Sequence, residues 1–109
     1  MAHQHSNIST TDYEPFLVND KQAGEVHWLR TEGSDGSPQY AGFWRCGPMT
    51  FDYVFPGDEI FQALEGELHI KTRDGEEVVV KKGDIVAFDK GVESVWTIPE
   101  GFTKFFVST

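Results

Sequence analysis

The sequence predicts an all-β domain in which short strands close into a barrel or sandwich. From residue 25 onward, runs of four to seven apolar or alternating residues recur at spacings near ten, separated by Gly, Pro and Asp. Asp74-Gly75 between two such runs is typical of a two-residue hairpin turn. No stretch between the runs has the apolar period of a helix. Because a single hairpin buries too little apolar surface to be stable, we expect all the strands to share one core.

Each expected strand is delimited by residues that favour turns. Residues 68–73 are the clearest case, since apolar and polar side chains alternate there as in a strand with one buried face. In chain order, the expected strands and the turns that follow them are 26–30 (loop 32–38), 40–46 (Gly47-Pro48), 49–55 (Pro56-Gly57-Asp58), 60–64 (Glu65-Gly66), 68–73 (Asp74-Gly75), 78–81 (Lys82-Gly83-Asp84), 85–88 (Lys90-Gly91), 93–98 (Pro99-Glu100-Gly101) and 102–107.

The 109 residues correspond to one domain, which we place at 25–109. Residues 1–24 are polar and aperiodic except for Phe16-Leu17-Val18, so we expect a flexible N-terminal arm. The arm carries His3 and His5, a pair that could bind metal but has no fixed geometry at a chain end.

The charge is strongly acidic, with 18 acidic and 9 basic residues and a net charge of −9. Such a chain repels phosphate backbones and anionic lipids, so we expect neither nucleic acid nor a membrane as partner. Cys46 is the single cysteine and cannot form an internal disulfide, which fits a reducing compartment. We find no apolar run of membrane-spanning length and no signal peptide, so the expected location is cytoplasmic.

Two motifs resemble those of the cupin superfamily. Residues 58–67, Asp-Glu-Ile-Phe-Gln-Ala-Leu-Glu-Gly-Glu, resemble half of the first cupin motif, and residues 82–91, Lys-Gly-Asp-Ile-Val-Ala-Phe-Asp-Lys-Gly, resemble the second. Trp44 with Gly47-Pro48, and Ser94 with Trp96, resemble the subfamily that includes ureidoglycine aminohydrolase and the ethanolamine-utilisation cupin. The resemblance covers residues 42–107 and implies a double-stranded β-helix, or jelly-roll, barrel.

The resemblance also indicates where a metal site would lie. Metal-binding cupins have two histidines six and four residues before the motif glutamate and a third after the second motif. In this chain those positions hold Tyr53, Phe55 and Ser94, and only the glutamate, Glu59, remains. A phenylalanine cannot coordinate and the two hydroxyls stay protonated near neutral pH, so we expect no metal and no cofactor. His69 is expected to face solvent, whereas His27 could face either way.

If the strands follow the family register, a mouth pocket would be lined by aromatic and polar side chains. Glu59 is the candidate catalytic residue, because a carboxylate among aromatic rings with no cation beside it in the sequence suits a general acid or base. It could equally cap the preceding turn. Phe51 and Phe61 are expected to be core, and Cys46 a buried apolar residue. The candidate ligand-binding residues are Trp44, Tyr53, Phe55, Glu59, Ser94 and Trp96.

Three functions remain open from the sequence. The first is a metal-free cupin that binds a small polar metabolite in the barrel mouth. The second is a metal-dependent enzyme similar to ureidoglycine aminohydrolase, although that enzyme has two cupin domains. The third is a non-catalytic structural or accessory module with a filled barrel. The sequence does not decide whether the protein is an enzyme. Small cupins usually dimerise, so we also expect a homodimer.

Overall fold

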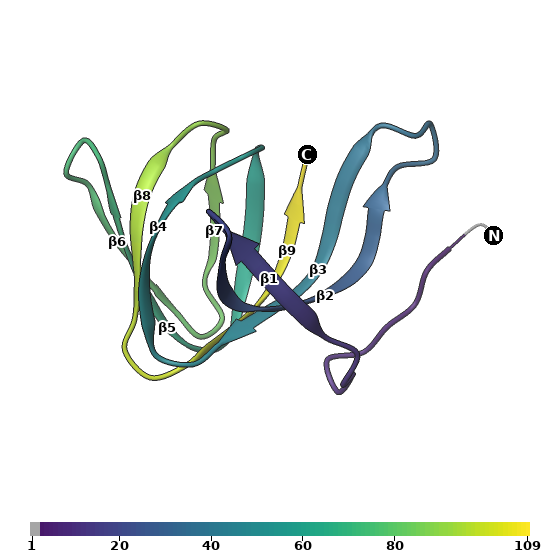
Figure 1. Ribbon diagram of the computed structural model, residues 1–109, viewed down its shortest axis with the longest axis horizontal. Helices are drawn as coiled ribbons and strands as arrows, with labels where there is room; N and C mark the ends of the chain where they lie inside the picture. Colours follow the sequence, from purple (N-terminus) through teal and green to yellow (C-terminus); the bar gives the residue numbers. More distant parts are fainter. Residues whose placement is uncertain (1–2) are drawn as a thin grey trace.

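The structure is a computed structural model that describes residues 3–109, and all of its regular structure is β (Figure 1). No helix that could span a membrane occurs in this part of the chain. The nine strands are β1 (Glu14–Val18), β2 (Lys21–Glu32), β3 (Pro38–Cys46), β4 (Met49–Val54), β5 (Glu59–Thr72), β6 (Glu77–Lys81), β7 (Ile85–Phe88), β8 (Glu93–Ile98) and β9 (Phe102–Ser108).

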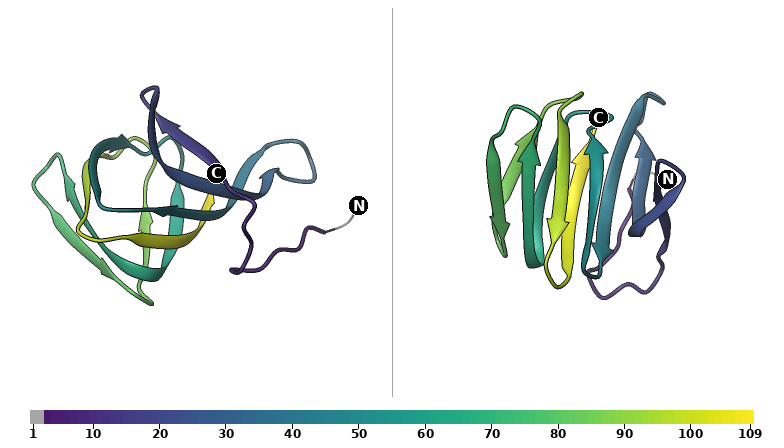
Figure 2. Two further views of the ribbon diagram at one scale, coloured as in Figure 1. Left: turned by 60° about the horizontal axis from the view of Figure 1, so that its bottom comes forward. Right: turned by 60° about the vertical axis from the view of Figure 1, so that its left-hand side comes forward.

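The strands form two antiparallel layers that share β5. The first half of β5 pairs with β7 and β9, and the sheet continues through β3 and β2 to β1. The second half of β5 pairs with β6 and β8, and β8 pairs in turn with β4. The two layers face each other around a common interior, as the views in Figure 2 show. This arrangement confirms the jelly-roll barrel predicted from the sequence.

Gly66 is the position at which β5 passes from one layer to the other. Its φ is +82°, which only glycine adopts without strain, and a Cβ there would lie 1.9 Å from the carbonyl oxygen of Gly101. From the sequence we expected two strands here, 60–64 and 68–73, separated by a turn at Glu65-Gly66. Because glycine allows the backbone to bend while the ladder continues, the two predicted strands are one.

β1 and the start of β2 lie in the segment that we expected to be a flexible arm. Asn19 and Asp20 connect them, with φ of 51° and 64°, which are values that a tight hairpin turn of two residues requires. β1 pairs antiparallel with β2, Val18 facing Lys21, and the register shifts once between Pro15 and Leu17. Figure 1 shows β1 crossing in front of the barrel. Part of the segment is therefore ordered against the domain.

The interior is filled from both layers by alternating side chains. In β9 every second residue from Phe102 to Ser108 is buried, and β8 shows the same alternation. The core combines large aromatic residues with aliphatic ones such as Leu68 and Val80. Phe51 and Phe61, expected to be core, pack within or against this cluster. Packing is incomplete at one end of the barrel, where a cavity remains.

Candidate functional site

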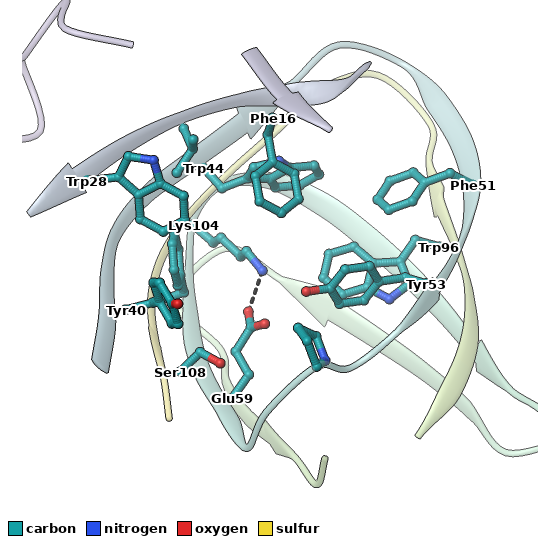
Figure 3. Close-up of a pocket in the computed structure, with 13 residues that line it drawn as sticks. Phe16, Trp28, Tyr40, Trp44, Phe51, Tyr53, Glu59, Trp96, Lys104 and Ser108 are labelled. Carbon is teal, nitrogen blue, oxygen red and sulfur yellow. Dashed lines mark hydrogen bonds and ion pairs between the residues drawn. The ribbon is translucent and has the colours of Figure 1, made fainter. Parts of the chain in front are cut away.

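An aromatic-walled cavity of about 260 Å³ lies inside the barrel (Figure 3). Seven of its thirteen lining residues come from β1, β2, β3 and β4, and others come from β5, β8 and β9. From the first group the aromatic walls are Phe16, Trp28, Tyr40, Trp44, Phe51 and Tyr53, and from the second they are Trp96 and Phe106. A space of this volume holds several water molecules or one small organic molecule.

An ion pair lies at the wall of this cavity. The Lys104 ammonium on β9 donates a hydrogen bond of 2.5 Å to Oε2 of Glu59 on β5. The two side chains are 6% and 4% exposed, so the pair is almost fully removed from bulk water. Along the ladder Lys104 is opposite Ala63, and Glu59 is opposite Ser108. The lysine side chain therefore runs along the sheet to reach the carboxylate.

Aromatic faces surround the Lys104 ammonium. Its Nζ lies 4.5 Å from the ring centroid of Phe61 and 4.7 Å from that of Trp96. The rings of Trp44 and Phe106 are each 5.3 Å away. These contacts stabilise a cation, but the loss of water outweighs them for the protonated form. Burial lowers the pKa of Lys104, and the neighbouring Glu59 carboxylate opposes part of that shift.

Tyr53 adds a third polar group to the cavity. Burial raises the pKa of Tyr53, and the negative charge of Glu59 raises it further. The phenol therefore remains protonated and can donate a hydrogen bond across the physiological range. Figure 3 shows its hydroxyl pointing toward the part of the cavity that holds the Glu59–Lys104 pair. A hydroxyl, an ammonium and a carboxylate thus face one another among aromatic rings.

Hydrogen bonds fix the two indole rings that form walls. Trp44 Nε1 donates to the backbone oxygen of Ala23 at 2.8 Å. Trp96 Nε1 donates to Oγ of Ser94 at 3.0 Å, and that hydroxyl donates to the backbone oxygen of Tyr53 at 2.7 Å. Because their N–H groups are already bonded, these indoles offer flat apolar faces to the cavity.

The structure brings together four of the six residues that we expected to line a pocket: Trp44, Tyr53, Glu59 and Trp96. The other two lie elsewhere. Phe55 is 1% exposed and stacks on Phe88 with centroids 4.6 Å apart, so it belongs to the core. Ser94 is buried and its hydroxyl is engaged by Trp96 and the Tyr53 backbone. These two residues support the wall and do not form it.

Lys104 was not predicted from the sequence, because no cation lies beside Glu59 in the chain and its partner comes from β9, 45 residues further on. The alternating pattern of β9 places Lys104 between Phe102 and Phe106 on the buried face. That signal was ambiguous, because Phe105 and Val107 make the other face of the strand equally apolar. Phe16 and Trp28 were missed because their strands fall within or beside the presumed arm.

The residues at the cupin ligand positions do not fit a divalent metal ion. Phe55 has no lone pair, the Tyr53 phenol stays protonated, and Ser94 is committed to other hydrogen bonds. The remaining carboxylate, Glu59, is paired with an ammonium that would repel a cation. Across residues 3–109 no group of three or more His, Cys, Asp or Glu side chains is placed to hold a metal.

The remaining candidate residues lie away from the cavity. His69 is exposed and hydrogen-bonds Glu67, as its strand parity predicted. His27 is buried on the opposite side of its sheet, where its ring bonds the Ser6 hydroxyl and the Asp12 carbonyl. Cys46 is half-buried, and burial raises the pKa of its thiol to about 11, which leaves it a poor nucleophile. None of the three takes part in the site.

The jelly-roll barrel and its interior pocket define the class of protein as a cupin. The chain belongs to the EutQ-like cupin family, whose model matches residues 33–106.

Named relatives agree with this assignment. The chain is 34% identical over 74 residues to the acetate kinase EutQ of Salmonella typhimurium, a match that covers 68% of this chain and 32% of that protein. The chain therefore spans about a third of the length of that relative. The crystal structure of ethanolamine utilization protein Q from the same organism has a TM-score of 0.67 and 33% identity, covering 77% of this chain and 67% of the other. A DUF861 family protein of Thermotoga maritima has a TM-score of 0.57 and 33% identity, covering 59% and 73%.

Proposed function

We propose that this protein is a metal-free cupin that binds a small molecule with a flat apolar body and one polar head in the aromatic cavity. The observation that carries the proposal is the buried Glu59–Lys104 pair beside an apolar space of about 260 Å³. In a barrel that served only as a scaffold, apolar residues in place of Glu59 and Lys104 would give the same or greater stability, because a buried ion pair contributes little net stability compared with apolar residues of similar size. Apolar side chains that filled the space would also stabilise such a barrel.

The polar groups indicate the head group. Lys104 and Tyr53 are donors and Glu59 is an acceptor, so the complementary head has an acceptor and a donor side by side. Amides and ureides have this arrangement. A simple carboxylate would be repelled by Glu59, and a simple ammonium by Lys104. The aromatic rings that line the cavity would enclose the apolar body of such a ligand.

A nucleotide is a poor fit for the same cavity. The name acetate kinase belongs to a relative three times the length of the matched segment. Triphosphate sites concentrate positive charge and backbone N–H groups around the phosphates. Here the one ammonium in the cavity is already neutralised by a carboxylate. We therefore assign a small neutral ligand to this domain.

A thermal-shift series with benzamide, phenylurea, benzoate and benzylamine tests the proposal. Benzamide and phenylurea are expected to raise the Tm, and at about 100 times the dissociation constant a ligand adds about 2.7 kcal/mol to the free energy of unfolding. Tyr53→Phe should reduce the rise in Tm that the ligand causes. Tyr13→Phe should not, because Tyr13 lies outside the cavity. If none of the four compounds changes the Tm of the native protein, the barrel is better described as an accessory module.

A further inference from the structure

The Lys104 amine has the surroundings of a nucleophile. Its Nζ borders the cavity, its side chain is 6% exposed, and four aromatic rings lie within 5.3 Å. Elsewhere in the chain the lysines are exposed. An amine held away from water loses much of the hydration that keeps an ordinary lysine protonated, and this is how enzymes activate lysine toward carbonyl groups.

Glu59 provides the partner that such an amine needs. In a site with little water, a lysine–carboxylate pair can exchange its shared proton and become a neutral amine hydrogen-bonded to a neutral acid. Because the two groups are directly hydrogen-bonded, the proton can pass between them without an intervening water. The direction of the Lys104 pKa, lowered by burial, agrees with an accessible neutral form.

We propose that Lys104 forms an imine with a small aldehyde or ketone bound in the aromatic cavity, with Glu59 transferring the protons. The inference rests on the binding cavity of the proposed function and concerns its other proton arrangement: once Glu59 holds the proton, Glu59 and Tyr53 are both donors, and the complementary head is a carbonyl oxygen that only accepts. The cavity of about 260 Å³ and its aromatic walls favour a compact carbonyl compound with a flat or apolar body.

The step balances without an oxidant or a cofactor. Lys104 first gives one ammonium proton to Glu59, and the freed electron pair on Nζ attacks the carbonyl carbon. The former carbonyl oxygen accepts a proton from Glu59 and becomes a hydroxyl. Nζ then returns a proton to Glu59, and the hydroxyl leaves as water with a proton from the same acid while the C=N bond forms. Tyr53, which stays protonated, can hydrogen-bond the oxygen throughout.

Reductive trapping tests the inference on the native protein. The protein is incubated with benzaldehyde and sodium cyanoborohydride, which converts an imine into a stable secondary amine, and peptides are then mapped by mass spectrometry. We expect one adduct per chain, at Lys104, ahead of the five exposed lysines Lys21, Lys71, Lys81, Lys82 and Lys90. Between pH 8 and pH 6, labelling of an exposed lysine should fall about tenfold for each pH unit, and labelling of Lys104 should fall less.

The controls separate this inference from the proposed function. Lys104→Arg should abolish the major adduct, and Lys90→Arg should leave it unchanged. Benzamide at saturating concentration should slow labelling of Lys104 and not of the surface lysines. If benzamide raises the Tm but label spreads over the exposed lysines and spares Lys104, the inference is overturned and the binding proposal stands. If benzamide also has no effect, both are overturned. Because the mapping uses native protein, it does not depend on the folding of either variant.

Discussion

At the scale of single residues, the Glu59–Lys104 pair is the most unusual feature of the molecule. Both side chains are almost fully buried, and each is the other's charged partner. Removing two charges from water costs several kcal/mol for each, which their attraction offsets only with good geometry. The pair therefore makes each residue depend on the other, and single and double substitutions should have very different effects.

A double-mutant cycle measures this dependence. Glu59→Gln and Lys104→Met should each lower the free energy of unfolding by about 3–5 kcal/mol, because each leaves a buried charge without its partner. The double variant should recover much of that loss, giving a coupling energy at the upper end of the usual range of about 0.5–3 kcal/mol. Urea denaturation gives all four values. Additive losses would mean that the two side chains are independent.

The pH dependence of the Glu59→Gln variant follows from the same pair. Without the carboxylate, the main opposition to the burial that lowers the pKa of Lys104 below its ordinary 10.5 is removed. At pH values between the pKa of Lys104 in the folded variant and its pKa in the unfolded chain, the unfolded chain binds more protons. The free energy of unfolding therefore rises with pH over this range and levels off above 10.5. Unfolding curves from pH 6 to 10 should show this rise relative to the Glu59→Gln/Lys104→Met variant. A flat difference would show that Lys104 is not buried in the folded variant.

Individual site residues differ in how far the sequence could predict them. Glu59, Tyr53 and Trp96 could be placed because motif spacing sets their strand and parity sets their face. Phe55 shares that parity, yet it follows the end of β4 and turns into the core against Phe88. Lys104 could not be assigned, since both faces of its strand are apolar in sequence and only the folded barrel shows which one is inside.

At the scale of elements, β5 determines how the two layers connect. It pairs with β7 and β9 before Gly66 and with β6 and β8 after it. Glu59 begins this strand, and the alternation of its first half puts Glu59 on the buried face with Phe61 and Ala63. The sequence showed the glycine and the apolar runs but not that hydrogen bonding continues through the bend, because continuity depends on partner strands far away in the chain.

Gly66→Ala tests the importance of this bend, with Gly75→Ala as a matched control. Both glycines have a positive φ, +82° and +91°, so either alanine incurs a backbone strain of about 1–2 kcal/mol. At Gly75 the new methyl group would meet nothing within 4 Å, whereas at Gly66 it would overlap the Gly101 backbone oxygen. Gly66→Ala should therefore be more destabilising by about 1–3 kcal/mol in urea unfolding. Equal losses would show that β5 can move away from Gly101.

β1 shows why the N-terminal segment was predicted less well than the barrel. Its only clear apolar run is Phe16-Leu17-Val18, and Leu17 is in fact exposed. The turn at Asn19-Asp20 is a hairpin signal, since both residue types tolerate a positive φ better than most. What fixes the hairpin is the contact of Phe16 with the cavity and with Trp28, 6.4 Å between centroids. Such a long-range contact has no local signature.

At the scale of the whole molecule, apolar side chains on the outside of the barrel offer a surface through which the expected homodimer could form. Ile60 on β5 and Ile85 on β7 are 57% and 68% exposed, on neighbouring strands of one sheet. Val107 on β9 is the ladder partner of Ile60. Together they form an apolar outer face around β5, β7 and β9. A stable interface covers about 800 Å² on each partner, more than these residues alone supply, so neighbouring polar residues would form its rim.

We expect two copies of the chain to associate through this outer face. Ile60→Glu should convert a dimer into a monomer in multi-angle light scattering, since it places a charge at the centre of the contact. Val54→Glu is the matched control: Val54 is 56% exposed but lies on β4 in the other layer, so its substitution should leave the dimer intact.

With a net charge of −9 on each copy, repulsion opposes association, and added salt should strengthen the native dimer. A native protein that is monomeric at every salt concentration would rule out the association. A dimer that dissociates with Val54→Glu and persists with Ile60→Glu would place the interface on the β4 layer instead.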